Sequence, residues 1–399
     1  MRSRRLWEAV GTAALLISVV SACSNAPKAS SDGSTQGPTS SPSATESSAR
    51  ITSSIPADAT GVKVNRSLRL NVSDGTFIEV HVTGKSGAMQ GALSADKLSW
   101  QSTARLQPGE TYNVRSSAVD AHGTNTVYRA TFSTQALPLS KQAFPSFFPL
   151  PGATVGVGMP AIIRFDVPIT DKASIEKHLH VTSQPAQPGA FHWVSDHEVH
   201  WRPQQYWQAG TKVTVVADID SVPAGKGVFG QKSRTSTFTI GRSMVSKVDT
   251  RTDQMRVFRD GKLIRTIPIT TGQQPDFTTR SGVKIIVEKS RRHDMNSETI
   301  GIDPNGPNGY NLKGVEFAMR LTYSGEFVHA APWSVGSQGH ANVSHGCTGM
   351  STANAAWLYN QTLVGDVIEY TGTNKPMTLT NGIGDWNEPF TQYAEGSAL

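Results

Sequence analysis

The sequence repeats one layout of short β-strands at a spacing of about 100 residues, and this repeat constrains the fold more than any other feature. The stretch LQPGETYNVRSSAVDAHG (106–123) joins a Pro-Gly turn to an alternating strand pattern, and WQAGTKVTVVADIDSVP (207–223) repeats the same turn, strand and exit. Each is followed by a closing strand, YRATFSTQ (128–135) and TSTFTIG (235–241). Because alternation of apolar and polar residues is typical of strands with one buried face, the sequence predicts two similar β-sandwiches.

The beginnings of the two units correspond as well, with DATGVKVNRSLRLNV (58–72) matching PGATVGVGMPAIIRFDV (151–167). Short strands separated by Gly, Pro and Asp turns favour an immunoglobulin-like sandwich for each unit, although neither contains the paired cysteines of antibody domains. The second unit is rich in histidine, at His178, His180, His192, His197 and His200. We interpret FHWVSDHEVHW (191–201) as two hairpin strands with Trp193 and Trp201 inward and the polar residues outward, in preference to a metal cluster.

The N-terminus begins with basic residues and continues into an apolar run from Ala9 to Val20, the pattern of a signal peptide. This run is too short to span a bilayer as a helix, and it ends in Ser-Ala-Cys, which resembles a bacterial lipobox. The resemblance implies lipidation of Cys23, whereas an ordinary signal peptide would make this cysteine incidental. Residues 24–50 are mostly small and polar and predict a flexible tether.

Cys347 is the one cysteine left if Cys23 carries a lipid. Exported proteins usually pair their cysteines in disulfides, so a lone thiol points to a function, the alternative being an inert, buried cysteine. Its neighbours favour function because His345 precedes it by two residues, Gly346 and Gly349 flank it, and His329 ends an earlier strand.

The segment that begins near Gly241 predicts a third, β-rich domain. A hairpin turn is expected at 259–261, a strand at GVKIIVEKS (282–290), and a long loop of the lid or binding type at 293–311. Two further strands are expected in FAMRLTYSGEFVHAAPWS, with His329 at the end of the second. Ser351 is the expected N-cap of a helix over 352–363, and GDVIEY (365–370) returns as a strand.

These residues predict acyl transfer through a thioester. A thiol with an ordinary pKa of ~8.5 becomes a good nucleophile only when a base or cation helps to form the thiolate. His329 is placed to accept the proton, and in an extended chain His345 would point to the same side as Cys347. The glycines leave backbone N–H groups uncrowded near a developing oxyanion.

His329 followed after fourteen residues by Ser344-His345-Gly346-Cys347 resembles the signature of the L,D-transpeptidases, which cross-link bacterial peptidoglycan. The whole chain is similar to the mycobacterial lipoprotein members of that family, including a tail with Trp386. The resemblance implies Cys347 as nucleophile and His329 as base, with His345 also in the catalytic set. It further implies a substrate-binding set of Met295, Tyr310, Ala330, Trp333, Ser344 and Gly346, in which Met295 and Tyr310 belong to the lid.

Three departures from the family pattern stand out. Thr348 and Gly349 follow the cysteine where the family usually has a hydrophobic residue and Asn, which removes an amide side chain. Ile300 replaces a lid aromatic, which puts that contact in doubt. Ala330 replaces a frequent Ser after the base, so that only its carbonyl could hold the imidazole N–H.

The expected organisation is mainly β, with two immunoglobulin-like sandwiches before a β-rich catalytic domain that carries one or two short helices. The predicted parts are a signal peptide (1–22), a lipidated tether (23–50), two sandwiches (51–138 and 139–240), a catalytic domain (241–373) and a tail (374–399). We expect an exported protein, lipid-anchored to the outer face of the cell membrane and working in the periplasm or cell wall. The net charge of +6, which falls to +4 without the signal peptide, suits an anionic wall.

The resemblance implies that a tetrapeptide stem is the acyl donor, that a diamino-acid amine of a second stem is the acceptor, and that a 3→3 cross-link forms. Carbapenems are expected inhibitors, and neither a cofactor, a metal nor a nucleic-acid partner is expected. Three alternatives stay open. These are an L,D-carboxypeptidase that trims stems, a non-catalytic wall-binding lipoprotein, and a zinc hydrolase using His329, His340, His345 and Cys347.

Overall fold

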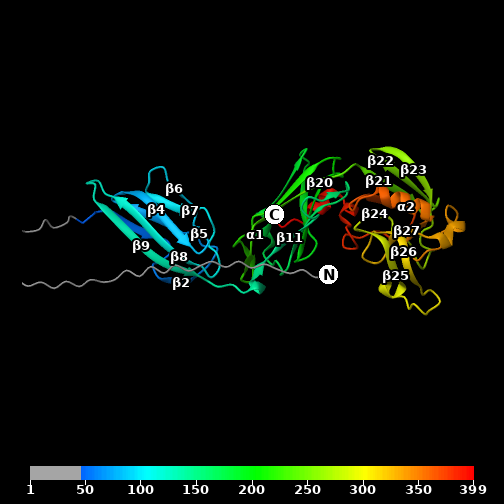
Figure 1. The fold of residues 1–399 in the computed structure, drawn as a ribbon, viewed down its shortest axis with the longest axis horizontal. Coiled ribbons are helices and arrows are strands. Elements are labelled where there is room, and N and C mark those ends of the chain that lie inside the picture. The colour runs from blue at the N-terminus through cyan, green and yellow to red at the C-terminus, as the bar shows by residue number, and fades with distance from the viewer. Residues whose placement is uncertain (1–45) are drawn as a thin grey trace, which may run out of the picture. The chain divides into compact units, whose positions relative to one another are not determined.

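The computed structural model describes residues 46–399 (Figure 1), and by their contacts residues 47–399 belong to a single unit. The predicted signal peptide, Cys23 and nearly all of the predicted tether lie outside the described residues. No helix within residues 46–399 is long and apolar enough to cross a membrane. The fold is mainly β, as the sequence predicts.

The first sandwich has two antiparallel sheets around a core that includes Phe77, Trp100, Tyr112 and Phe132. In spatial order, one sheet contains β1 (Arg50–Ser53), β3 (Arg69–Ser73), β7 (Ser99–Ser102) and β6 (Gly91–Leu93). The other contains β2 (Ala59–Val62), β9 (Asn125–Thr134), β8 (Thr111–Val119), β4 (Thr76–Gly84) and β5 (Gly87–Ala88), with β2 parallel to β9. Ala49 is buried in this core, so the folded chain starts slightly before the first strand.

The second sandwich repeats this layout, because its short strand β12 is also parallel to the closing strand β20. One sheet contains β11 (Pro145–Phe148), β13 (Ala161–Phe165), β16 (Glu198–Pro203) and β15 (Gly189–Trp193). The second contains β12 (Thr154–Val155), β20 (Arg234–Ile240), β17 (Lys212–Ala217) and β14 (Leu179–Gln184). A small sheet of β10 (Gln142–Ala143), β19 (Val228–Gly230) and β18 (Pro223–Gly225), the short helix α1 (Lys172–Glu176) and the 3₁₀ turn η1 (Leu139–Lys141) complete it.

The predicted catalytic domain, or catalytic segment, combines two sheets with the helix α2 (Thr352–Gln361), which packs against β26 and β27. One sheet contains β23 (Lys262–Pro268), β22 (Gln254–Arg259), β21 (Met244–Asp249), β29 (Val367–Thr371) and β24 (Gly282–Ile285). The other contains β25 (Glu288–Asn296), β26 (Asn311–Arg320), β27 (Phe327–Ala330) and β28 (Thr348–Met350). The 3₁₀ turns η2 (Ser297–Ile300) and η3 (Pro332–Ser337) lie between strands, and Ser351 caps α2 as predicted.

The prediction of one strand over 282–290 was wrong, because the chain changes sheets in the middle of this segment. β24 ends at Ile285 and β25 begins at Glu288 in the other sheet. Ile285 packs into the core that centres on the second sandwich, whereas its neighbour Ile286 packs into the core of the catalytic segment. Consecutive apolar residues here pack into two different cores, and a period-two pattern of apolar residues does not predict such an arrangement.

The C-terminal tail packs on the second sandwich through η4 (Asp385–Asn387) and α3 (Phe390–Ala394). Trp193 and Trp201 face inward as predicted, but His200 was wrongly placed outward. Its ring lies between Asp385 Oδ1 at 2.8 Å and Glu198 Oε1 at 2.6 Å, with only 3% of the residue exposed. The tail covers this face of the sheet, so a polar residue there becomes a buried ion-pair partner.

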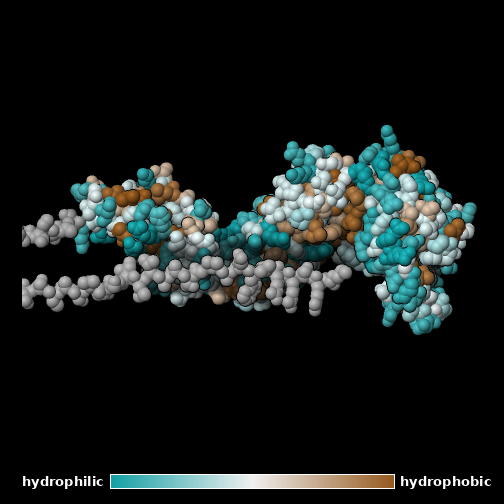
Figure 2. Space-filling model, in the orientation of Figure 1, coloured by the Kyte–Doolittle hydropathy of each residue, from teal (hydrophilic) through white to brown (hydrophobic). Residues whose placement is uncertain are grey.

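The visible surface over the catalytic segment is largely hydrophilic, with separate hydrophobic patches (Figure 2). One patch lies over the β22–β23 hairpin, where Leu263 and Ile264 are exposed (Figure 2). The hairpin turns at Asp260 and Gly261, both with positive φ, as the turn residues predict. Trp333, an exposed aromatic residue, belongs to the candidate site.

Candidate active site

Two adjacent parallel strands place the predicted nucleophile beside the predicted base. Cys347 immediately precedes β28, and His329 lies on β27, where it pairs with Gly349. The strands are therefore in a register that brings two residues 18 positions apart in sequence to the same end of the sheet. Both side chains line one cavity.

His329 is buried and its ring is held in one tautomer. Its Nδ1–H donates to the carbonyl oxygen of Ala330 at 2.8 Å, and since a carbonyl can only accept, Nε2 is the unprotonated nitrogen. The Ala330 carbonyl thus holds the imidazole as the sequence predicts. Burial lowers the pKa of His329, although this hydrogen bond opposes the shift. The indole of Trp333 stacks on the imidazole with ring centroids 5.9 Å apart.

Cys347 is half-buried and protonated at neutral pH. Burial raises the pKa of its thiol to about 12, with Glu326 adding to the shift, while the Phe327 N–H and Lys284 oppose it. The thiol donates to the carbonyl oxygen of Gly325 across 3.5 Å. The resting pair is therefore a neutral thiol beside a neutral imidazole, a weak nucleophile that needs its base during the reaction.

The turn that carries the thiol is closed by its own side chains. Ser344 Oγ donates to the carbonyl oxygen of Cys347 at 2.6 Å and accepts from the Gly346 N–H at 3.1 Å. Gly346 has φ of 123°, a conformation that favours glycine. The chain bends at His345 and Gly346. The prediction that an extended chain would point His345 to the same side as Cys347 was therefore wrong. The His345 ring lies between Phe277 and Tyr310 and still lines the cavity.

Two cavities meet at the thiol. The first has a volume of about 310 Å³ and is lined by Thr270, Met295, Tyr310, Leu312, His329, Ala331, Trp333, Ser334, Val343, Ser344, His345, Cys347 and Gly349. The second, of about 290 Å³, is lined by His293, Asp294, Met295, Asn296, Thr299, Ile300, Tyr310, Arg320, Tyr323, Gly325, Phe327 and Cys347. Met295, Tyr310 and Cys347 line both, whereas Ala330 and Gly346 line neither.

The departures from the family pattern have local consequences. A Cβ on Gly349 would lie 2.9 Å from the Ala331 Cβ and 3.1 Å from the Thr270 Cγ2, so this position is crowded, contrary to expectation. The Gly349 N–H donates to the Thr270 carbonyl and is not free to bind an oxyanion. Ile300 packs over Gly325, where a Cβ would meet its Cγ2 at 2.5 Å. This lid residue therefore covers the peptide that holds the thiol.

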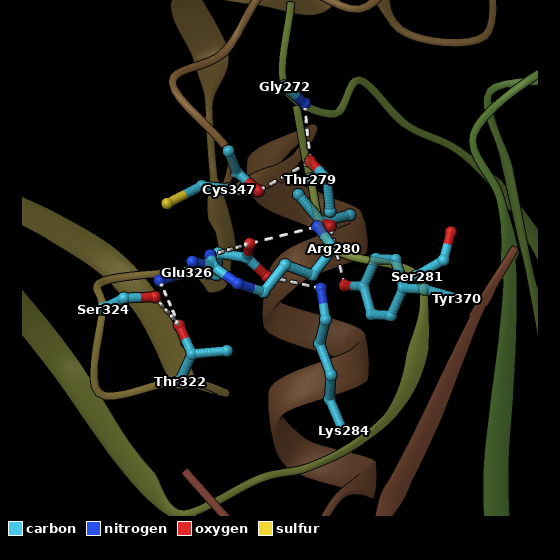
Figure 3. Close-up of polar contacts among 12 residues, drawn as sticks. Gly272, Thr279, Arg280, Ser281, Lys284, Thr322, Ser324, Glu326, Cys347 and Tyr370 are labelled. Carbon is cyan, nitrogen blue, oxygen red and sulfur yellow. Dashed lines mark hydrogen bonds and ion pairs between the residues drawn. The ribbon is translucent and has the colours of Figure 1, made fainter. Parts of the chain in front are cut away.

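Sequence analysis missed a polar cluster behind Cys347 (Figure 3). Arg280 and Lys284 converge on Glu326 (Figure 3), and Thr279 Oγ1 donates to the carbonyl oxygen of Gly346 at 2.8 Å. The available signal was a lysine in the apolar run GVKIIV and a glutamate between Gly325 and Phe327. Within residues 46–399, no group of three or more His, Cys, Asp or Glu side chains is placed to hold a metal ion.

Comparisons with known proteins match both the sandwich region and the segment that carries this site. Residues 59–223 match the bacterial Ig domain, and residues 243–369 match the L,D-transpeptidase catalytic domain. The chain is 35% identical over 351 residues to L,D-transpeptidase 2 of Mycobacterium tuberculosis (strain CDC 1551 / Oshkosh), with 88% of this chain and 85% of the relative covered. It is 34% identical over 353 residues to L,D-transpeptidase 5 of strain H37Rv, with 86% and 76% covered. A solved structure of the LD transpeptidase LdtMt1 in complex with imipenem gives a TM-score of 0.51 at 35% identity, covering 58% of this chain and 99% of that chain.

Proposed function

The chain belongs to the L,D-transpeptidase family, whose members act in peptidoglycan cross-linking, and we propose that it forms 3→3 cross-links through an acyl-enzyme on Cys347. The observation that carries this proposal is the meeting of two cavities at Cys347. A transpeptidase must bring an acyl donor and an amine acceptor to one sulfur from different sides. One cavity on each side of the thiol provides room for both.

In the acylation step, His329 Nε2 accepts the thiol proton while the sulfur attacks the carbonyl of the third residue of a tetrapeptide stem. Backbone N–H groups at Cys347 and the hydroxyl of Tyr310 stabilise the oxyanion. Burial raises the pKa of Tyr310 to about 12, so this hydroxyl stays protonated and can donate. When the C–N bond breaks, the protonated His329 gives its proton to the leaving D-alanine amine, and a thioester remains.

In the transfer step, the side-chain amine of a second stem attacks the thioester carbonyl. His329 accepts a proton from that amine and returns it to the departing sulfur, which restores the neutral pair. The Ala330 carbonyl keeps Nε2 available in both steps because it occupies Nδ1–H. Water in place of the amine would give carboxypeptidase activity by the same sequence of proton transfers.

The remaining site residues bind and shape the substrate in this proposal. Met295 and Tyr310 line both cavities, Trp333 and His345 line the first cavity, and Ser344 and Gly346 keep the thiol turn in shape. We assign the domain boundaries as predicted, except that the first sandwich begins at Ser47, and place the enzyme outside the membrane, anchored through Cys23, with the two sandwiches as spacers. Carbapenems are expected to acylate Cys347, since a solved relative is in complex with imipenem.

The test is acylation of the 47–399 fragment, which is a compact unit, by a carbapenem, followed by intact mass and peptide mapping. One adduct should form per chain, map to the peptide with Cys347, be absent in Cys347→Ala, and form in the presence of a chelator. Incubation with tetrapeptide stems should then give a cross-linked dimer by mass. An unmodified mass with a reduced thiol would refute the proposed nucleophile, and trimmed stems without dimer would indicate a carboxypeptidase.

A further inference from the structure

A buried cluster of opposite charges lies directly behind the thiol (Figure 3). Glu326 is 5% exposed and accepts from the Arg280 N–H at 3.1 Å and from Arg280 Nη1 at 3.0 Å. Its other carboxylate oxygen pairs with Nζ of Lys284, which has no exposed surface. Burying three charges is costly unless they are paired and hydrogen-bonded, as they are here. The proposed reaction assigns this cluster no role.

The cluster is connected to Cys347 through the backbone on both sides. Glu326 lies between Gly325, whose carbonyl accepts from the thiol, and Phe327, whose N–H points toward the sulfur. On the other side, Lys284 Nζ lies 3.7 Å from the centroid of the Tyr370 ring. The Tyr370 hydroxyl hydrogen-bonds Thr348 Oγ1 at 2.7 Å, and Thr348 follows the cysteine directly. A change in Glu326 therefore reaches the sulfur through the adjacent backbone, and a change in Lys284 reaches Cys347 through Glu326 or through Tyr370 and Thr348.

We propose that Lys284 and Glu326 are positioning residues for Cys347, which fix the 325–327 backbone against the sulfur, and that the positive charge of Lys284 offsets the unfavourable effect of the Glu326 charge on the thiolate. Arg280, Lys284 and Glu326 together carry a net charge of one positive unit. In a buried environment such a charge acts on a nearby ion far more strongly than it would in water. This inference rests on the proposed role of Cys347 as nucleophile.

The charged and titratable groups that act on or face the thiol come from several elements. They are Lys284 on β24, Tyr310 before β26, Arg320 on β26, Glu326 and His329 around β27, His345 in the thiol turn, and Tyr370 on β29. Among these charges Glu326 has the largest effect and raises the pKa of Cys347, whereas Lys284 and then Arg320 lower it. A thiolate at Cys347 would in turn favour the charged form of Lys284. The lysine is the buried cation of this set, so it is the one to remove.

The test measures the rate of Cys347 alkylation by iodoacetamide against pH in the 47–399 fragment. Lys284→Met leaves Glu326 paired with Arg280 and removes the net positive charge, so alkylation at a fixed pH should slow on the order of three- to tenfold. Lys284→Arg should stay near the wild-type rate. Glu326→Gln should not slow alkylation, because it removes the negative charge that opposes the thiolate. The positive charge of Arg280 remains even if Lys284, now without its partner, loses its proton.

A merely structural role would give a different pattern. If the cluster only supported the fold, Lys284→Met and Glu326→Gln would slow alkylation alike, and that outcome would overturn the inference. Lys289→Met is the matched control, because Lys289 is also partly buried and lies 4.3 Å from the centroid of an aromatic ring, that of Tyr359. It should leave the rate unchanged.

Two features of the experiment allow it to contradict the inference even if one variant does not fold or the proposed function is wrong. If Lys284→Met does not fold, the isosteric Glu326→Gln decides alone, since slowed alkylation in a folded Glu326→Gln contradicts the charge argument. Alkylation needs no peptidoglycan chemistry, so its outcome is separate from that of the carbapenem experiment. Loss of the carbapenem adduct with the expected alkylation pattern would refute the proposed function and keep the assignment of Lys284.

Discussion

The pH dependence of Cys347 alkylation would show how the thiol is protonated in the free enzyme. Burial raises the pKa of this thiol to about 12 from an ordinary 9.0, a shift of about 3 units. Such a shift disfavours the thiolate by about 4 kcal/mol relative to an exposed cysteine. At pH 7 only about one thiol in 10⁵ would be ionised. His329 does not compensate in advance, because burial lowers the pKa of its imidazole and so disfavours the charged form of this group too.

The rate constant for alkylation by iodoacetamide should therefore rise about tenfold per pH unit from pH 6 to pH 10 without a plateau, since the thiolate is the nucleophile. The same protein unfolded in urea should give an ordinary titration with a midpoint between ~8.5 and the ordinary 9.0. His329→Ala should keep the slope of this profile and lower carbapenem acylation by about 10²- to 10⁴-fold, the range of general base catalysis. The rates are measured by quenching and intact mass, with Cys347→Ala as the blank.

A plateau that is complete by pH 7 would refute this reasoning. It would mean that thiolate and imidazolium already exist as an ion pair in the free enzyme, as in cysteine enzymes whose thiol has a depressed pKa. The Ala330 carbonyl would then stabilise a charged His329, and the burial of both groups would not control their protonation. An intermediate midpoint near pH 9 would show that the thiol is effectively solvated despite its position.

Two further predictions concern packing and the tail. Gly349→Asn, which restores the usual family residue, should destabilise the fragment by about 1–3 kcal/mol and slow acylation, because its Cβ would crowd Ala331 and Thr270. Gly336→Asn is the control, because a Cβ at Gly336 would lie in open space and should leave the melting temperature unchanged. An unchanged melting temperature for Gly349→Asn would contradict the crowding. Burial disfavours the charged form of His200, but the carboxylates of Asp385 and Glu198 outweigh this effect and raise the pKa of His200 to about 9 from 6.5. The protonated ring therefore stabilises the fold by about 3 kcal/mol. This stabilisation is complete below pH 6.5 and is lost as the pH rises through about 9. Hydrogen exchange of residues 385–395, corrected for pH, should show faster opening in His200→Gln than in wild type at pH 6, a gap that closes by pH 9.5. Exposed His81→Gln should match wild type throughout, and a gap independent of pH would exclude titration of His200 as its cause.

The sandwiches could be predicted because their strands have one buried and one exposed face. In β8 and β17 the side chains alternate between core and solvent, so a period of two in the sequence corresponds directly to burial. The hairpin at Asp260 and Gly261 was equally accessible, since its turn needs residues that tolerate positive φ. Local geometry and a single core were sufficient in these cases.

The sequence could not predict elements that serve two cores or meet a distant segment. Ile285 and Ile286 look like one strand until the sheets are known. His200 follows the alternating pattern of an exposed residue, and only the tail at Asp385 buries it. Lys284 and Glu326 are separated by 42 residues, and no periodicity relates them. These positions are fixed by tertiary contacts that local patterns do not contain.

The candidate site shows the same division between local and tertiary information. Cys347 and His329 could be singled out from residue type and spacing, but their pairing depends on the parallel register of β27 and β28. Their protonation depends on a third level, the burial of both groups. A neutral thiol reacts slowly with oxidants as well as with iodoacetamide, because the thiolate is the reactive form in both reactions. The burial that makes the free enzyme a weak nucleophile therefore also protects it until a bound substrate presents its carbonyl and the proton moves to His329. Residues 46–399 contain no second cysteine that could resolve an oxidised Cys347, so the enzyme would gain from this arrangement, which gives a chemical reason for keeping the thiol neutral at rest.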